Sequence, residues 1–172
     1  MEFLEKTLEK EEIFKGKIVD LSIHIVELPN GKKSKREIIN HPGAVAIVAF
    51  TKENKILMVR QFRKPLEKVL LEIPAGKLEH NEDIKDCALR ELEEETGFIA
   101  GELEYLGKIH TSAGFCNECI HIFKATKLGK GTLGGDEDEF ISTEEYSLDD
   151  VKNMVKSGEI TDAKTISSLM YL

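Results

Sequence analysis

Short apolar runs bounded by polar turns dominate the first half of the chain. Runs of this kind, rich in β-branched residues, are typical of β-strands because branched side chains pack well on a pleated sheet. They occur at residues 17–27, 44–51, 55–62 and 69–76. The dipeptide Asn30-Gly31 follows the first run and predicts a hairpin turn, with the partner strand in the sequence KREII. The pattern therefore predicts a strand-rich first half.

One segment in the middle of the chain has helical rather than strand spacing, and it spans Asp83–Thr96. Its apolar stripe consists of Ile84, Ala88 and Leu92, with Cys87 close by. Such a stripe packs one side of a helix on a sheet. Asn81 is placed to cap the start of the helix, and Gly97 is placed to stop it. The spacing predicts a helix with one buried side and one polar side.

The rest of the chain continues the alternation of strands and helices. Further strands are expected at 102–112, 119–128 and 139–147, and helices at 148–160 and 162–172. The first dozen residues have no firm period, which leaves a short helix or a mobile arm open. We predict one α/β (α+β) fold with a mixed sheet. A semi-independent N-terminal unit of antiparallel strands, residues 1–42, precedes the main domain, 43–172.

Composition and charge narrow the class of protein. With 172 residues, 41% hydrophobic and 33% charged, the chain suits one compact globular domain. A net charge of −8 argues against nucleic acid or an anionic membrane surface as a partner. The first residues are too charged for a signal peptide, and the chain lacks an apolar run of about 18 residues. We therefore expect a cytoplasmic location.

The cysteines leave several interpretations open. Cys116 and Cys119 form a CxxC pair with His110 and His121 nearby, and Cys87 lies in the predicted helix. A structural zinc site normally needs a second pair of ligands with similar spacing. A zinc site, a redox pair and plain reduced thiols are all compatible with the pattern, and reduced thiols are the simplest.

The polar side of the predicted helix carries an acidic cluster. Glu91, Glu94 and Glu95 share one face, because positions three and four apart are neighbours on a helix. Adjacent carboxylates ionise together only when cations neutralise them, and Mg²⁺ or Mn²⁺ prefer oxygen ligands of this type. A solvated acidic face is the alternative.

The context of this cluster resembles the signature of the Nudix hydrolases. The matching positions in residues 76–98 are Gly76, Glu82, Arg90, Glu91, Leu92, Glu94, Glu95, Gly97 and Phe98. The resemblance implies a mixed sheet sandwiched between helices. It also implies hydrolysis, with bound divalent metal, of a pyrophosphate linked to another moiety.

The resemblance further implies roles for single residues. Glu91 and Glu95 would be the principal metal ligands, the backbone carbonyl of Ala75 would complete the site, and Glu94 would contribute directly or through water. Arg90 would hold a carboxylate in place or form only a surface pair with Glu94. Glu82 would be either structural or a ligand. Two or more Mg²⁺ or Mn²⁺ ions per site are expected.

Segments outside the signature are similar to the ADP-ribose pyrophosphatase branch of this family. They are REIINHPGAVAIV, VRQFRKP, LEIPAGKLE, TSAGFCNE and DEDEFI. By resemblance, the substrate is bound by Arg36, Arg63, Ser112, Gly114 and Glu118. Ala113 departs from the usual proline, and Phe14 is the nearest aromatic that could stack on adenine. The branch implies a homodimer that exchanges its N-terminal strands.

The same resemblance makes the acidic segment before residue 140 a catalytic loop. Glu137 or Glu139 would be the general base and the other would lie near a metal, with Glu137 favoured as the base. The expected reaction converts ADP-ribose to AMP and ribose 5-phosphate. Hydrolysis of another nucleoside diphosphate sugar, or a non-catalytic module that binds ADP-ribose, remains an alternative.

Overall fold

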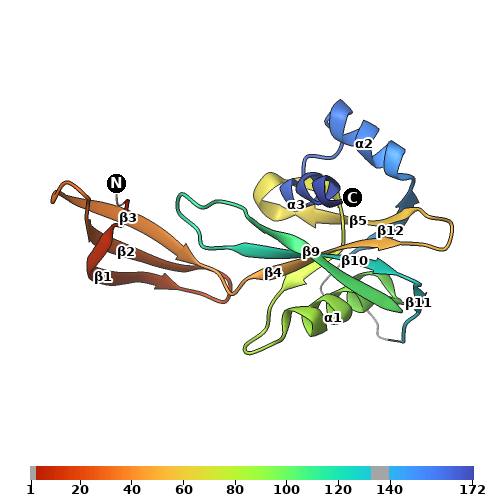
Figure 1. The fold of residues 1–172 in the computed structure, drawn as a ribbon, viewed down its shortest axis with the longest axis horizontal. Helices are drawn as coiled ribbons and strands as arrows, with labels where there is room; N and C mark the ends of the chain where they lie inside the picture. The colour runs from red at the N-terminus through yellow and green to blue at the C-terminus, as the bar shows by residue number, and fades with distance from the viewer. Residues whose placement is uncertain (1–2, 133–139) are drawn as a thin grey trace. The chain divides into compact units, whose positions relative to one another are not determined.

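The structure is a computed structural model that describes residues 3–132 and 140–172. Its backbone contacts divide the chain into two units (Figure 1). Unit 1 comprises Met1–Gly43 and His110–Cys119, and unit 2 comprises Ala44–Ile109 and Ile120–Leu172. Within the described residues, no helix is long and apolar enough to cross a membrane.

Unit 1 contains a three-stranded antiparallel sheet in the order β1-β2-β3. Its strands are β1 (Lys6–Lys15), β2 (Asp20–Glu27) and β3 (Lys33–Asn40). The predicted hairpin turn is confirmed, and Gly31 adopts a φ of 78°, which glycine tolerates without strain. The first residues form β1 rather than a helix or an arm. Every β1 side chain is exposed, so this strand is held by its backbone pairing with β2. Without a buried face, its sequence has no regular spacing of apolar residues.

The main sheet of unit 2 is mixed. Its central strand β4 (Ala44–Phe50) runs parallel to β10 (Cys119–Thr126) and antiparallel to β5 (Ile56–Arg63). The order is β12-β5-β4-β10-β9, with β6 paired to β5 and β7 paired to β4. The other strands are β6 (Lys68–Glu72), β7 (Ala75–Lys77), β9 (Glu102–His110) and β12 (Ser142–Tyr146). The predicted mixed sheet is confirmed.

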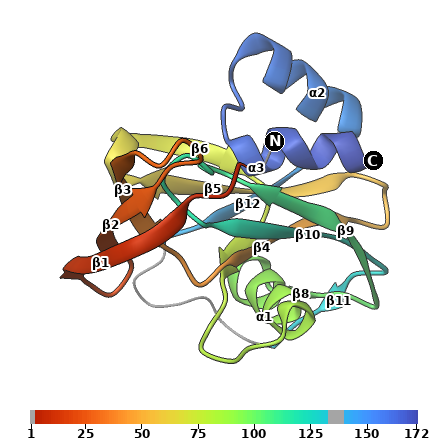
Figure 2. The same cartoon turned by 60° about the vertical axis from the view of Figure 1, so that its left-hand side comes forward.

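Helices cover both faces of this sheet, as Figure 2 shows. Helix α1 (Ile84–Thr96) lies on one face, and α2 (Leu148–Ser157) and α3 (Ala163–Ser168) lie on the other. Alternate residues of β4 join two separate apolar clusters, one that includes Leu92 of α1 and one that includes Val151 of α2. Because β4 is buried on both faces, its sequence is an unbroken apolar run.

The remaining elements are short. They are the 3-10 helices η1 (Lys64–Leu66) and η2 (Leu169–Tyr171) and the paired strands β8 (Phe98–Ile99) and β11 (Gly129–Lys130). Both predicted C-terminal helices are present as α2 and α3, with narrower bounds than the sequence pattern suggested. The expected sandwich of a mixed sheet between helices is therefore confirmed.

Candidate functional site

Two caps fix where helix α1 begins and ends. The Asp83 side chain accepts a hydrogen bond of 2.8 Å from the backbone N–H of Lys85. At the other end, Gly97 has a φ of 72° and its N–H donates to the carbonyl oxygen of Glu93. The predicted stop at Gly97 is confirmed, whereas the predicted cap at Asn81 is wrong. Asn81 has a φ of 62° and lies in the turn before the helix.

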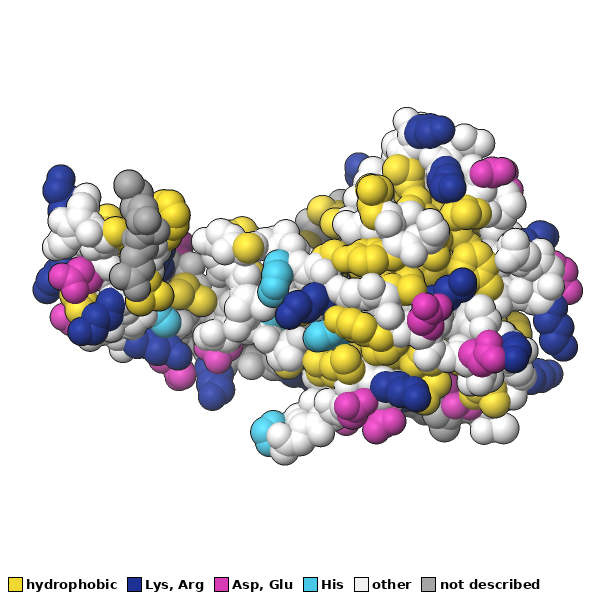
Figure 3. Space-filling model, viewed as in Figure 1, with side chains coloured by type: hydrophobic (Ala, Val, Ile, Leu, Met, Phe, Trp, Pro, Cys, Tyr) yellow, Lys and Arg dark blue, Asp and Glu magenta, His cyan; other side chains and the backbone are white. Residues whose placement is uncertain are grey.

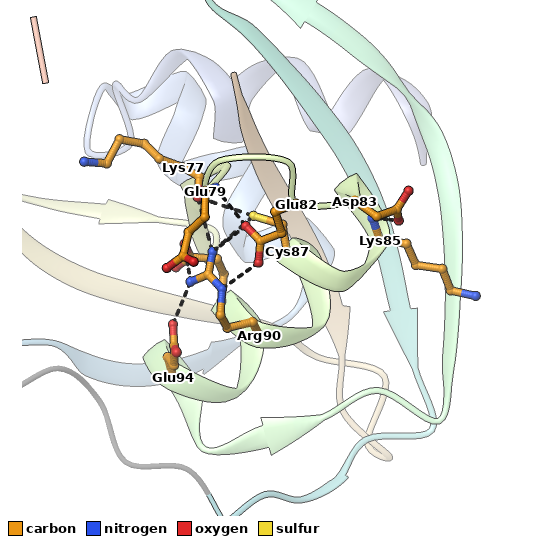
Figure 4. A network of polar contacts seen from close by, with 9 residues as sticks. Lys77, Glu79, Glu82, Asp83, Lys85, Cys87, Arg90 and Glu94 are labelled. Atoms are coloured by element: carbon orange, nitrogen blue, oxygen red, sulfur yellow. Dashed lines mark hydrogen bonds and ion pairs between the residues drawn. The ribbon is translucent and has the colours of Figure 1, made fainter. Parts of the chain in front are cut away.

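Arg90 connects the acidic side chains of α1 to the loop that precedes it (Figure 4). Its Nε and Nη2 atoms donate to the two carboxylate oxygens of Glu82 at 2.8 and 2.9 Å. Its Nη1 donates to Glu91 and to Glu94, both at 2.9 Å. Nη2 also reaches the carbonyl oxygen of Lys77 at 3.2 Å. One guanidinium therefore orders three carboxylates and the end of β7.

The charges in this network stabilise one another. Hydrogen bonds from Arg90 lower the pKa of the Glu82 carboxyl to about 2. The same bonds raise the pKa of Arg90, and Glu91 and Glu94 raise it further. Glu82 is thus committed to Arg90 by a bidentate pair, which is the strong geometry for these two groups. Of the two roles considered for Glu82, this geometry favours the structural one.

Glu91 and Glu95 reach back over strand β7. The side chain of Glu95 accepts a hydrogen bond of 2.9 Å from the backbone N–H of Ala75. Glu91 covers Gly76 so closely that a Cβ added there would lie 1.8–2.1 Å from its carboxylate atoms. Only glycine leaves room for this carboxylate. The structure thus brings Ala75, Glu91 and Glu95 together, with Glu94 one turn away on Arg90.

The oxygen donors of this region fit a hard divalent cation. Carboxylates and backbone carbonyls are the ligands that Mg²⁺ and Mn²⁺ prefer. In residues 3–132 and 140–172, no three His, Cys, Asp or Glu side chains are gathered closely enough to hold one ion. Arg90 engages Glu91 and Glu94 in this conformation. The carboxylates that would hold a cation are therefore already ordered by the guanidinium.

Arg63, at the end of β5, is held by a buried acid. Its Nε and Nη2 donate to the two oxygens of Glu72 at 2.8 and 2.6 Å. Glu72 is 1% exposed and also binds the amine of Lys164 from α3. Burial opposes ionisation of Glu72, yet Arg63 and Lys164 outweigh it and lower the pKa of that carboxyl. The bond to Glu72 raises the pKa of Arg63, and the charge of Glu95 raises it further.

Arg36 lies on β3 in unit 1 and is bound to an acid of the same unit. Its Nε and Nη2 donate to the two carboxylate oxygens of Glu5 at 2.8 and 2.6 Å, and its Nη1 donates to Ser34. Basic and acidic side chains lie side by side over β1–β3 in Figure 3. Arg36 is therefore paired within unit 1 rather than part of a purely basic surface.

The predicted loop residues Ser112, Gly114 and Glu118 also belong to unit 1. The carbonyl oxygen of Ser112 accepts backbone hydrogen bonds from Phe115 at 3.0 Å and Cys116 at 2.9 Å, which closes a tight turn. A Cβ at Gly114 would meet nothing within 4 Å, so this glycine lines open space. The loop is therefore ordered by its own backbone, with Ala113 in place of the usual proline.

Glu137 and Glu139, the predicted general base and metal contact, lie outside the described residues. The chain just before them is fixed to the helix. The Glu93 side chain accepts a hydrogen bond of 2.7 Å from the backbone N–H of Thr132, and a Cβ at Gly131 would lie 2.7 Å from Glu93. Glu93 occupies an unspecified position of the signature, so the sequence resemblance gave it no role.

Sequence reasoning also missed Glu72 and Lys164. A signal for Glu72 was present, because it is the one charged residue in the apolar run VLLEIPAG. A buried acid normally needs a paired cation. The sequence does not identify that cation, since Lys164 is 92 residues away along the chain.

Cys87, Cys116 and Cys119 all lie in the described residues and form no disulfide bond with one another. Burial raises the pKa of the Cys87 thiol to about 12, and its sulfur lies against Arg90 and the carbonyl oxygen of Lys77. Cys116 and Cys119 are partly buried in the loop and at the start of β10. The interpretation of the CxxC pair as reduced thiols stays a prediction.

Known proteins resemble this chain in sequence or in fold. An ADP-ribose pyrophosphatase of Bacillus subtilis (strain 168) is 54% identical over 172 residues, which cover 98% of this chain and 92% of that protein. A methanol dehydrogenase activator of Bacillus methanolicus is 52% identical, with coverage of 99% and 93%. The crystal structure of an ADP compounds hydrolase shares the fold, with a TM-score of 0.88, 22% identity and coverage of 99% and 94%. The NUDIX domain family matches residues 40–169, and this chain is a member of that family.

Proposed function

We propose that this protein hydrolyses ADP-ribose to AMP and ribose 5-phosphate in a reaction that depends on Mg²⁺. The observation that carries the proposal is the convergence of Glu91 and Glu95 on the backbone of Ala75 and Gly76. The 54% identity to an ADP-ribose pyrophosphatase over almost the whole chain supports this substrate. The intact acidic positions favour an enzyme over a module that only binds ADP-ribose.

We assign Glu91, Glu95 and the carbonyl oxygen of Ala75 as ligands of Mg²⁺ or Mn²⁺, with Glu94 acting directly or through water. Bound divalent ions, two or more per site, would neutralise the pyrophosphate and lower the pKa of an attacking water. Arg90 holds Glu91 and Glu94 in place before a cation arrives. Outer contacts of this kind orient metal ligands.

The proton would be taken from the attacking water by Glu137 or Glu139. We favour Glu137 as the base and Glu139 as the metal contact. A general base needs only to come within hydrogen-bond reach of the water in the complex with substrate. Glu93 contributes by holding Thr132, a few residues before these acids.

The substrate would be bound by two arginines and by residues of the loop at 112–118. Arg63 donates to Glu72 through Nε and Nη2. Its Nη1 group would then donate a hydrogen bond to a phosphate oxygen of the substrate. Arg36 would give up one of its two hydrogen bonds to Glu5 and donate to the substrate instead. Ser112, Gly114 and Glu118 would contact the terminal ribose, whose hydroxyls suit a carboxylate acceptor.

We also propose a homodimer in which residues 1–42 are exchanged and residues 43–172 form the hydrolase domain. The fully exposed strand β1 supports this, because its apolar side chains Leu8, Ile13 and Phe14 are 38–56% exposed. Light scattering after size exclusion is expected to give the mass of two chains. A monomer under these conditions would exclude the exchange.

The first test is incubation of the purified protein with ADP-ribose and Mg²⁺, with and without a chelator, followed by chromatography. AMP and ribose 5-phosphate that disappear with the chelator are expected. If no AMP forms, calorimetry with ADP-ribose separates two alternatives. Binding without turnover would identify a non-catalytic module, and absence of binding would direct the assay to other nucleoside diphosphate sugars.

A second candidate function rests on the relative named methanol dehydrogenase activator, which is 52% identical over 172 residues. This chain could likewise raise the activity of a dehydrogenase. The test adds the protein to methanol dehydrogenase from Bacillus methanolicus and follows alcohol oxidation. A rise in rate that the Glu95→Gln variant fails to produce would support activation through the hydrolase site.

A further inference from the structure

Each carboxylate oxygen of Glu118 in unit 1 has a different polar side chain beside it, either Thr111 or His41. The hydroxyl of Thr111 donates to Oε2 at 2.6 Å. On the other side, Nε2 of His41 lies 3.6 Å from Oε1. That separation is an ion-pair distance rather than a direct hydrogen bond. The side chain of His41 is only 12% exposed, so its position is fixed by packing as well as by polar contacts.

A backbone hydrogen bond determines which ring nitrogen of His41 carries the hydrogen in the neutral imidazole. The N–H of Gly43 donates a hydrogen bond of 3.1 Å to Nδ1 of His41. Nδ1 is therefore an acceptor, and in the neutral ring the hydrogen must be on Nε2. The imidazole thus presents an N–H to the carboxylate.

The same segment is tied to the loop through its backbone. The N–H of His41 donates to the side-chain oxygen of Asn117 at 2.7 Å, and the N–H of Asn117 donates to the carbonyl oxygen of Ile39 at 3.2 Å. Ile39 in turn donates to the carbonyl oxygen of Phe115 at 2.7 Å. These bonds hold the loop and the end of β3 as one piece, so His41 and Glu118 move together.

We propose that His41 is a positioning residue that, with Thr111, sets the Glu118 carboxylate to receive the terminal ribose of the substrate. This rests on the proposed function, in which Glu118 contacts that ribose. A carboxylate only accepts hydrogen bonds, and the neighbouring hydroxyls of a ribose offer two donors. Because Thr111 and His41 each face a different oxygen of Glu118, each oxygen keeps a further lone pair that can accept from a ribose hydroxyl.

Three variants test the proposal through the Michaelis constant for ADP-ribose. His41→Phe keeps a ring and loses both nitrogens, so KM should rise about tenfold with kcat nearly unchanged, because ribose contacts are equal in the ground and transition states. His41→Gln offers an amide donor and should restore most of the affinity. His80→Phe is the control, because His80 is exposed and lies at an unspecified position of the signature.

A double-mutant cycle separates positioning from a structural role. In a Glu118→Gln background, His41→Phe should cause little further rise in KM. Equal effects of His41→Phe with and without Glu118→Gln would overturn the proposal. An equal loss of affinity for AMP and for ribose 5-phosphate as product inhibitors would also overturn it, because only the second carries the terminal ribose.

A spectroscopic measurement makes this test independent of turnover. Nitrogen-15 shifts of the His41 ring should identify hydrogen on Nε2, and ribose 5-phosphate should shift them in the wild type but not in Glu118→Gln. Failure of the wild type to release AMP would defeat the proposed reaction. Absence of the ribose 5-phosphate shift would defeat the role of His41, whatever the turnover.

Discussion

The backbone N–H of Ala75 donates a hydrogen bond of 2.9 Å to the side chain of Glu95, 20 residues further along the chain. This bond joins the last turn of α1 to strand β7. It brings the carboxylate of Glu95 to the backbone of Ala75, and these are two of the groups that we propose as metal ligands. The acidic face of α1 is therefore directed at the backbone of β7 rather than left in solvent.

Glu95→Gln should remove most activity. The amide can still accept the hydrogen bond from Ala75, so the fold should persist, but it lacks the charge that a divalent cation requires. We expect a fall in kcat of at least about 100-fold, or ~2.7 kcal/mol in activation free energy. Asp86→Asn is the matched control, because it removes one exposed charge from the same helix. Near-normal turnover of Glu95→Gln would exclude Glu95 as a ligand.

Gly76→Ala should displace Glu91. The new Cβ would lie 1.8–2.1 Å from the carboxylate atoms of Glu91, closer than any van der Waals contact. We expect loss of activity and weaker Mn²⁺ binding, which titration calorimetry can measure. Gly129→Ala is the control, since its Cβ would meet Ile99 at 3.4 and 3.7 Å. Unchanged Mn²⁺ affinity in Gly76→Ala would show that Glu91 does not hold the metal.

Glu137→Gln and Glu139→Gln should separate the general base from the metal contact. Loss of a metal ligand is partly reversed when the Mg²⁺ concentration is raised, whereas loss of the base is not. We expect Glu139→Gln to recover activity with Mg²⁺ and Glu137→Gln to stay inactive. Rates measured over a series of Mg²⁺ concentrations decide this. Recovery of Glu137→Gln but not of Glu139→Gln at high Mg²⁺ would make Glu139 the base and Glu137 the metal contact.

Glu82 should make stability depend on acid pH. Its folded-state pKa of about 2 lies below the ordinary 4.5, so the ionised carboxylate stabilises the fold fully above about pH 5. That contribution is lost as the pH falls from about 4.5 toward 2. We expect the wild type to exceed Glu82→Gln by about 1–2 kcal/mol in free energy of unfolding at neutral pH, and the difference to shrink near pH 2. Urea unfolding at several pH values measures it, and a constant difference would contradict the prediction.

Glu72→Gln should destabilise unit 2 without any change at the acidic face of α1. Glu72 is buried between Arg63 and Lys164, and its neutral replacement removes the bidentate partner of Arg63 and leaves Lys164 paired only with Asp162, at 3.2 Å. Removal of one partner from a buried ion pair costs about 3–5 kcal/mol. Denaturant unfolding measures the loss, and Glu67→Gln in the exposed pair with Lys64 is the control, with less than about 1 kcal/mol expected. A loss as small as the control's would contradict this account.

The fold could be predicted wherever local pattern and burial agree. The apolar run of β4 and the stripe of α1 are each buried in the structure, and the glycine stop at Gly97 is in place. The prediction failed where local chemistry offered two choices. Asn81 and Asp83 are both good caps, and the backbone conformation of the turn selected Asp83. Strand β1 shows no regular spacing of apolar residues, because it is held by backbone pairing with β2 rather than by packing on a core.

The sequence by itself determined the family, the acidic face of α1 and the residues expected to bind metal and substrate, because all of these depend on spacing within one short segment or on a linear motif. The tertiary structure decided which groups those residues meet. It paired Glu95 with Ala75, Arg90 with Glu82, and Arg63 with a buried Glu72 that Lys164 also binds. It also set His41 opposite Glu118, 77 positions along the chain. Contacts between distant segments depend on how the strands and helices pack, and no local pattern encodes them.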